Sequence, residues 1–117
     1  MTTFKHKFTL EQRMLESSRV ISKYNDRLPI ICEKSKRAKM TEIDKTKYLV
    51  PSDLTIGQFI FVIRRRLNLR AEEALYLFIN GSIPATAATI ASLYHVNKDE
   101  DGFLYIQYAS ENTFGYF

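Results

Sequence analysis

The chain has 117 residues, 45% of them hydrophobic, with a formal net charge of +4 and a single cysteine, Cys32. This length favours one domain with its own hydrophobic core. One cysteine excludes an internal disulfide and a cysteine-rich metal site, and no apolar run approaches the ~18 residues of a membrane-spanning helix. The N-terminus has no apolar stretch of the signal-peptide type, so we expect a reducing, cytoplasmic location.

Positive charge is concentrated in the first third of the chain. Residues 1–40 hold ten Lys/Arg and four Asp/Glu, a net of +6, whereas residues 41–117 hold seven and nine, a net of −2. A solvated helical face would account for the basic third, and so would a docking surface for an acidic partner, an anionic membrane or RNA. Charge alone leaves these interpretations open.

Residues 1–25 are predicted to form a helical extension. Met1–Lys7 is a small helix or a loose arm, and a longer helix begins after Thr9, which can form a capping box with Gln12. The turn residues Tyr24–Asp26 end this helix. Helical spacing gives the face that we expect to pack inward: Leu10, Met14, Ser17 and Ile21, with Val20 beside them.

The apolar run Leu28–Cys32 predicts a short strand, in which Pro29 limits pairing near the start. Cys32 is expected to be a small buried residue rather than a nucleophile. A nucleophilic cysteine needs a base, and neither His6 nor His95 has an evident sequence relation to Cys32.

After the charged loop Lys34–Thr46, the sequence predicts a strand, a stop and an amphipathic helix. The strand Lys47–Val50 runs into Pro51, which has no N–H for a sheet ladder, so the strand ends there or lies at an edge. Thr55 and Gln58 predict a second capping box, which marks the start of the helix.

This central helix is predicted to turn one apolar stripe toward the core: Ile56, Phe59, Ile60, Ile63 and Leu67. Phe61 and Val62 lie off the stripe, and large apolar residues there indicate a second contact surface. The run Arg64–Arg66 is either a solvated helix end, favoured by the helix dipole, or a contact for an acidic ligand.

The C-terminal half predicts two more strands and a short helix. Leu75–Ile79 is an unbroken apolar run, as expected for a strand covered on both faces. Asn80-Gly81 predicts a tight turn because both positions tolerate positive φ. Thr86–Leu93 reads as a short helix and Phe103–Tyr108 as a last aromatic strand. Residues Ala109–Phe117 show no hydrophobic periodicity, and we expect them to form an extended, mobile tail.

The predicted order of helices and strands favours an α+β fold, with a mixed sheet and the central helix packed across it. The sequence contains no GxGxxG, phosphate loop, HExxH or CxxC motif, and no Ser-His-Asp or paired-carboxylate arrangement stands out. We therefore expect a protein that is not an enzyme and that holds no metal or cofactor.

Three stretches resemble the autophagy ubiquitin-like modifiers, the family that includes the GABA-receptor-associated protein and the microtubule-associated protein light chains. They are Lys47–Phe59, Asp99–Tyr105 and Phe114-Gly115, and the similarity runs from about Phe8 to Gly115. The resemblance implies a ubiquitin-like β-grasp with a four-stranded mixed sheet and an N-terminal helical extension. It divides the chain into that extension (1–25), a ubiquitin-like domain (26–109) and a flexible conjugation tail (110–117).

If Lys47–Val50 is a sheet edge, its free N–H and C=O groups can pair with an extended peptide as an added strand. The resemblance implies a peptide with an aromatic residue and, three positions later, an aliphatic one. The aromatic pocket would consist of Glu16, Val20, Pro29, Ile31, Lys47, Leu49 and Phe103. The aliphatic pocket would consist of Tyr48, Val50, Pro51, Leu54, Phe59 and Val62. Acidic flanking residues would contact Arg27, Lys45, Lys47 and Arg66. For most of the apolar residues, simple core packing stays an open alternative.

The resemblance also assigns chemistry to the end of the chain. A cysteine protease would cleave the Gly115–Tyr116 bond and remove Tyr116-Phe117, and activating and conjugating enzymes would carry Gly115 to phosphatidylethanolamine. A residue without a Cβ passes a narrow channel and leaves its carbonyl open to attack. The modifier would become attached to autophagosome membranes and would recruit cargo receptors and adaptors.

Two alternatives stay open. One is an unconjugated basic module that binds RNA or acidic tubulin tails, although the resemblance makes nucleic acid an unexpected partner. The other is a modifier of protein lysines, which needs the same Gly115 and which the sequence does not separate from lipid conjugation.

Overall fold

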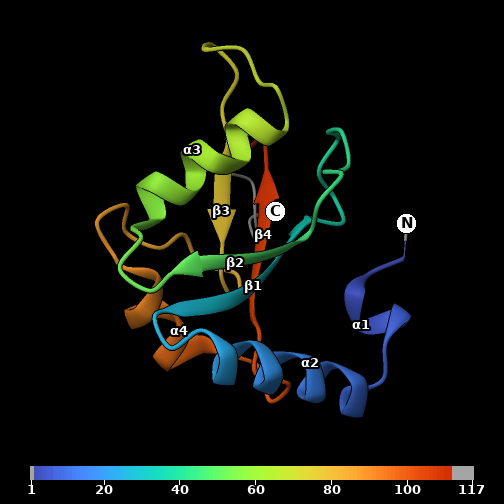
Figure 1. Cartoon of the computed structure of the whole chain (residues 1–117). Coiled ribbons are helices and arrows are strands. Elements are labelled where there is room, and N and C mark those ends of the chain that lie inside the picture. Colours follow the sequence, from blue (N-terminus) through green and yellow to red (C-terminus); the bar gives the residue numbers. More distant parts are fainter. Residues whose placement is uncertain (1, 112–117) are drawn as a thin grey trace.

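The structure is a computed structural model that describes residues 2–111. Within this range the elements follow in the order α1 (Phe4–Lys7), α2 (Leu10–Lys23), β1 (Arg27–Lys34), β2 (Lys47–Pro51), α3 (Ile56–Arg66), β3 (Tyr76–Phe78), α4 (Ile90–Asn97) and β4 (Leu104–Ala109) (Figure 1). This confirms the predicted order, and α1 shows that the first residues include a short helix. No helix within residues 2–111 has the length and apolar character that crossing a bilayer requires.

The four strands form one mixed sheet in the order β2-β1-β4-β3. β1 pairs with β4 in parallel, while the β1–β2 and β3–β4 pairs are antiparallel. Pro29 pairs with Leu49 of β2, but the register with β4 begins only at Ile30. The missing N–H of Pro29 therefore precedes the parallel ladder, which explains how a proline is tolerated in a central strand.

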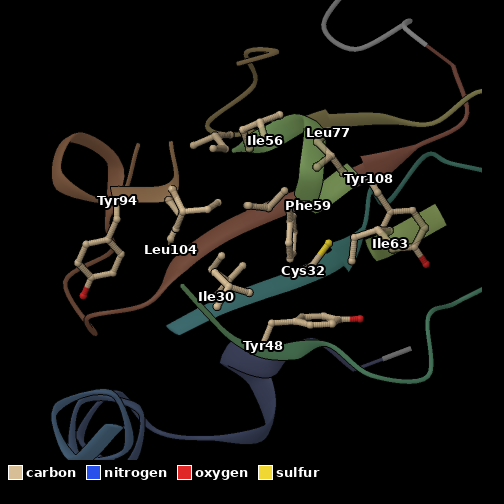
Figure 2. Packing of buried hydrophobic residues seen from close by; sticks show 14 of the residues in the cluster. Ile30, Cys32, Tyr48, Ile56, Phe59, Ile63, Leu77, Tyr94, Leu104 and Tyr108 are labelled. Carbon is tan, nitrogen blue, oxygen red and sulfur yellow. The ribbon is translucent and has the colours of Figure 1, made fainter. Parts of the chain in front are cut away.

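Alternation along the strands gives the sheet two different faces. Ile30 and Cys32 belong to the main core, whereas Ile31 between them packs with Phe4 and Phe103 on the opposite face. Helices α1 and α2 lie on that second face, and α3 crosses the first (Figure 1). In the main core, the fully buried Phe59 points from α3 toward β1 (Figure 2).

Helix α3 confirms its predicted start and its apolar stripe. Thr55 N–H donates to Gln58 Oε1 at 2.9 Å, and Gln58 N–H donates to Thr55 Oγ1 at 3.2 Å. Ile56, Phe59 and Ile63 are buried, and Ile60 and Leu67 pack against the core from its margin. Phe61 and Val62 are 61% and 38% exposed, as expected for apolar residues that lie off the stripe.

The predicted inward face of α2 is confirmed for Ser17 and, in part, for the half-buried Val20, but it was wrong for the three large apolar residues. The Thr9–Gln12 capping box is confirmed. Leu10, Met14 and Ile21 are exposed, and the buried residues of the helix are Arg13 and Ser17. The difference arises because α2 packs on the sheet through a polar cluster around a carboxylate that is distant in sequence. The most apolar face of the helix is therefore not the face turned inward.

That carboxylate belongs to Asp101, whose side chain is fully buried. Arg13 Nε donates to Asp101 Oδ2 at 3.0 Å, and the Tyr105 hydroxyl donates to the same oxygen at 2.5 Å. The Ser17 hydroxyl donates to the Asp101 carbonyl at 2.5 Å. The next residue, Gly102, has φ +90°, and a Cβ there would lie 2.3 Å from Ser17 Oγ. Only glycine permits both this backbone conformation and the close approach of α2.

Strands β1, β2 and β4 differ from their predicted bounds by one or two residues at an end, and α4 and β3 differ for reasons that the structure shows. The helix predicted at Thr86–Leu93 is α4, Ile90–Asn97, because Thr89 caps it and the preceding residues bond to α3 instead. Gly57 N–H donates to the Thr86 carbonyl at 2.9 Å, which holds that segment beside the start of α3. β3 is shorter than the predicted Leu75–Ile79 because Ile79 already bridges to Ser82 across the Asn80-Gly81 turn, where both turn residues have positive φ.

Replacing Arg13 by Ala should lower the free energy of unfolding by about 3–5 kcal/mol, because Asp101 would be left buried without its cation. Urea unfolding measures this change. The matched control is Lys5→Ala, which removes the exposed Lys5–Asp99 pair and should cost at most about 1 kcal/mol. Equal effects of the two substitutions would contradict the structural role given to the Arg13–Asp101 pair.

Candidate functional site

Strand β2 lies at one edge of the sheet, which confirms the prediction made from Pro51. Cys32 N–H donates to the Thr46 carbonyl at 2.8 Å, so these two residues form a hydrogen-bonded pair. Because such pairs alternate with non-bonded ones in an antiparallel ladder, Tyr48 and Val50 point their backbone groups toward β1. The N–H and C=O groups of Lys47 and Leu49 therefore point away from the sheet.

One of these outward groups already has a partner. The guanidinium of Arg27 donates from Nη1 to the Leu49 carbonyl at 3.3 Å, a long hydrogen bond to an exposed acceptor. Arg27 was expected to contact an acidic ligand, and in this structure it instead covers part of the edge. An incoming strand must compete with this contact for the Leu49 carbonyl.

The residues expected to line the aromatic pocket lie together on the α2 side of the sheet. Ile31 and Phe103 are fully buried and pack against Phe4. They therefore belong to the hydrophobic core and lie beneath the expected pocket. The accessible part is formed by the half-buried Glu16, Val20 and Leu49, together with the exposed Lys47; Pro29 is buried between them. The Lys47 ammonium forms an ion pair with Glu16, which ties β2 to α2 across this site.

The residues expected to line the aliphatic pocket lie on the α3 side of the same strand. Tyr48, Val50 and Phe59 are buried in the main core, with the Tyr48 and Phe59 rings edge to face at 5.6 Å. Core packing is therefore their main role, as the open alternative allowed. The accessible part consists of the half-buried Pro51 and Leu54 and the exposed Val62.

The other cations near the β2 edge are also engaged. Arg66 donates to both carboxylate oxygens of Asp44, at 2.9 and 3.3 Å, and these bonds hold the pKa of Asp44 below its usual value. The Lys45 ammonium lies 5.1 Å from the centre of the Tyr48 ring. An acidic ligand would meet cations that already have partners, which favours exchange of partners over simple attraction.

The sequence interpretation missed the pairing of these cations. Glu16 was expected as a wall of the aromatic pocket, but its ion pair with Lys47 could not be read from residues 31 positions apart. Asp44 lies in the charged loop, where no local sequence pattern indicated its pairing with Arg66. Arg64 is likewise not merely solvated, because its guanidinium donates to the carbonyls of Arg70 and Glu73.

Cys32, the single cysteine of the sequence, is not placed to act as a nucleophile. Cys32 is fully buried, and burial raises the pKa of its thiol well above the ordinary value, so that the reactive thiolate is disfavoured. No three His, Cys, Asp or Glu side chains between residues 2 and 111 gather as metal ligands would. Gly115 and the Gly115–Tyr116 bond lie outside the described residues.

Residues 12–115 match the sequence model of a family described as "Autophagy protein Atg8 ubiquitin like". The chain belongs to the Atg8 family. It is 51% identical to Autophagy-related protein 8 of Kluyveromyces lactis over 114 residues, which cover 97% of this chain and 92% of the relative. It is 52% identical to Autophagy-related protein 8c of Arabidopsis thaliana, with 97% and 96% covered. These matches confirm the resemblance to the autophagy modifiers.

Solved Atg8 structures confirm the ubiquitin-like fold. The crystal structure of Trypanosoma brucei ATG8 matches with a TM-score of 0.90 and 45% identity, covering 98% of this chain and 99% of that one. Plasmodium falciparum Atg8, solved in complex with a Plasmodium falciparum Atg3 peptide, matches with a TM-score of 0.87 and 35% identity over 95% and 98%. This Atg8-family chain therefore combines the family fold with a β2 strand at the edge of the sheet.

Cys32 should resist a soluble thiol reagent at neutral pH in the folded protein, because its thiol is buried and its pKa is raised. The same reagent should modify one thiol per chain after unfolding in guanidinium. Since Cys32 is the only cysteine, any labelling reports this position. Rapid, stoichiometric labelling of the folded protein would contradict its assignment as a core residue.

Proposed function

We propose that this Atg8-family protein is a lipid-conjugated modifier and an adaptor, and that it is not an enzyme. Its β2 edge recruits autophagy receptors and adaptors that carry an aromatic-x-x-aliphatic segment. Its Gly115 is joined to phosphatidylethanolamine after a cysteine protease removes Tyr116-Phe117. The protein is cytoplasmic before conjugation and attached to autophagosome membranes afterwards. In this proposal residues 1–25 are an extension, 26–109 the modifier domain and 110–117 the conjugation tail.

The observation that carries the adaptor half is the outward-pointing backbone of Lys47 and Leu49. Together they offer N–H and C=O groups at the spacing of a β-ladder, and an extended peptide satisfies such groups by adding a strand. The complex of Plasmodium falciparum Atg8 with an Atg3 peptide supports peptide binding as a property of this fold. The same complex and the family membership also support conjugating enzymes as partners of this chain.

Strand geometry also accounts for the spacing of the peptide motif. Side chains in a strand alternate between faces, so residues three positions apart point to opposite sides. Lys47 and Leu49 lie on the α2 face with the aromatic set, whereas Val50 belongs to the α3 face with the aliphatic set. The aliphatic set lies further toward Pro51, so a peptide that fills both runs parallel to β2.

The lipid half rests on Gly115 and on family membership. Two acyl chains anchor a protein stably, where one chain binds only marginally. Attachment to protein lysines instead would use the same glycine, and the nature of the conjugate distinguishes the two. An RNA-binding module is less favoured, because several N-terminal cations already pair with carboxylates of this chain: Lys5 with Asp99, Arg13 with Asp101 and Lys34 with Glu42.

A titration with an aromatic-x-x-aliphatic peptide should shift the backbone amide signals of Lys47–Val50 in the ¹⁵N spectrum. The opposite sheet edge, Tyr76–Phe78, should move little and is the internal control. Leu49→Ala should weaken binding about five- to tenfold, because half-buried apolar contact is lost at the site. The control is Val96→Ala, which removes an exposed apolar side chain that belongs to neither pocket, and this variant should bind as wild type. Unchanged amides at 47–50 under saturating peptide would refute the edge site.

Gly115→Ala should abolish stable membrane association in cells, because the added Cβ obstructs processing and transfer at this residue. Fractionation and intact-mass measurement check this, and wild type should lose the mass of Tyr116-Phe117 and gain that of the lipid. Ser110→Ala is the matched control in the same segment and should behave as wild type. Undiminished lipid attachment of Gly115→Ala contradicts the acceptor assignment, and a conjugate mass without lipid favours lysine modification.

A further inference from the structure

An internal carboxylate already occupies the cation at the end of α3. The Arg66 guanidinium donates from Nε to Asp44 Oδ1 at 2.9 Å and from Nη2 to Asp44 Oδ2 at 3.3 Å, so both carboxylate oxygens are engaged. The Arg66 and Asp44 side chains are 43% and 72% exposed, which leaves the pair open to a competing ligand. A partner that offers its own carboxylate must therefore exchange with Asp44.

Two tyrosine hydroxyls fix the loop that carries this carboxylate. The Tyr108 hydroxyl accepts the Ile43 N–H at 2.8 Å and donates to the Thr41 carbonyl at 2.7 Å. The Tyr48 hydroxyl donates to the Lys45 carbonyl at 2.6 Å. Both rings belong to the main core (Figure 2), so the residues on either side of the carboxylate are tied to the sheet. The carboxylate is therefore held in place before any ligand arrives, and its pairing with α3 needs little further ordering.

Arg66 lies where a bound segment would present one particular side chain. Helix α3 begins after the end of β2, and its last turn pairs with the loop before β2, so the helix runs back along the strand (Figure 1). Arg66 follows Val62 by four positions, which places it on the same side of α3 and one turn nearer the start of β2.

The proposed direction of the bound segment identifies that side chain. In a segment parallel to β2, the residue two positions before the aliphatic one points to the same face and lies about 7 Å nearer the start of the strand. One turn of α3 covers about 5.4 Å, so the residue that directly follows the aromatic one faces Arg66. This step rests on the proposed function, because it uses the orientation of an added strand.

A carboxylate at this position gains little over a neutral side chain. It would replace Asp44 on Arg66, so that one exposed ion pair forms while another is lost. The displaced Asp44 carboxylate would stay beside the incoming one, because the loop is fixed on both sides of it, and the two like charges repel each other. Asp44 therefore reduces the benefit that Arg66 alone would give to an acidic segment.

We propose that Asp44 is a specificity-determining residue of the β2 site. It competes for Arg66 and so limits the preference for a carboxylate directly after the aromatic residue of the bound segment. Selection of partners then depends on the aromatic and aliphatic side chains. Segments with a neutral residue after the aromatic one are bound nearly as well as acidic segments.

The test compares two fluorescently labelled aromatic-x-x-aliphatic peptides that differ only in a Glu or a Gln directly after the aromatic residue. Fluorescence anisotropy should give wild-type affinities for the two peptides within about twofold of each other. Asp44→Asn should bind the Glu peptide about three- to fivefold more tightly than the Gln peptide, because Arg66 is then free of a competing charge. Arg66→Gln combined with Asp44→Asn should remove this preference.

The matched control is Glu42→Gln, which removes one negative charge from the same loop. Glu42 pairs with Lys34 at 3.7 Å rather than with Arg66, so this variant should bind the two peptides as wild type does. Asp44→Asn keeps a side-chain oxygen at position 44, and the pair that it removes is exposed. The variant should therefore unfold at nearly the wild-type urea concentration.

Each outcome can be assigned. A clear preference for the Glu peptide in wild type, or no preference in Asp44→Asn, overturns the role of Asp44 and leaves the β2 edge intact. An equal preference in Glu42→Gln and Asp44→Asn assigns the effect to net charge and also overturns the proposal. Absence of binding by either peptide to wild type contradicts the proposed function and with it the specificity role of Asp44.

Discussion

The double-sided pairing of β1 determines that β2 is left at the edge of the sheet with free backbone groups. β1 gives one side to the parallel ladder with β4 and the other to the antiparallel ladder with β2. Pro51 then ends β2, and the chain turns into α3 before any further strand can pair with it. The outer backbone groups of Lys47 and Leu49 are left pointing outward because the topology places no strand beside them.

The same strand separates two chemical environments. On one face, alternate residues of β1 are buried beneath α3 in an apolar core that includes the fully buried Phe59. On the other face, α2 is held by buried polar contacts at Asp101, and α1 adds the buried ring of Phe4. The β2 edge lies between these faces, so a strand added there, as we propose, would lie beside side chains of both faces.

Sequence reasoning predicted the features that local chemistry determines. The capping pairs Thr9–Gln12 and Thr55–Gln58, the Asn80-Gly81 turn and the end of β2 at Pro51 each depend on residues close in sequence. The inward face of α2 could not be predicted, because Asp101 decides it from 88 residues away. The predicted start of α4 was too early, because backbone N–H groups at the start of α3 donate hydrogen bonds to the loop that precedes α4. The site residues came from the family resemblance, and the pairing of their cations required the fold.

The contacts that cover the β2 edge have a consequence for proteins crowded together on a surface. An open strand border is a template on which identical molecules can stack into aggregates. In this protein the Arg27 guanidinium covers the Leu49 carbonyl at the β2 edge. The charged Lys47 side chain lies on the same edge, and β2 ends at Pro51 after five residues. In the proposed membrane-attached state, these contacts should limit edge-to-edge pairing of neighbouring copies through β2, because an incoming strand must first displace the Arg27 guanidinium from the Leu49 carbonyl.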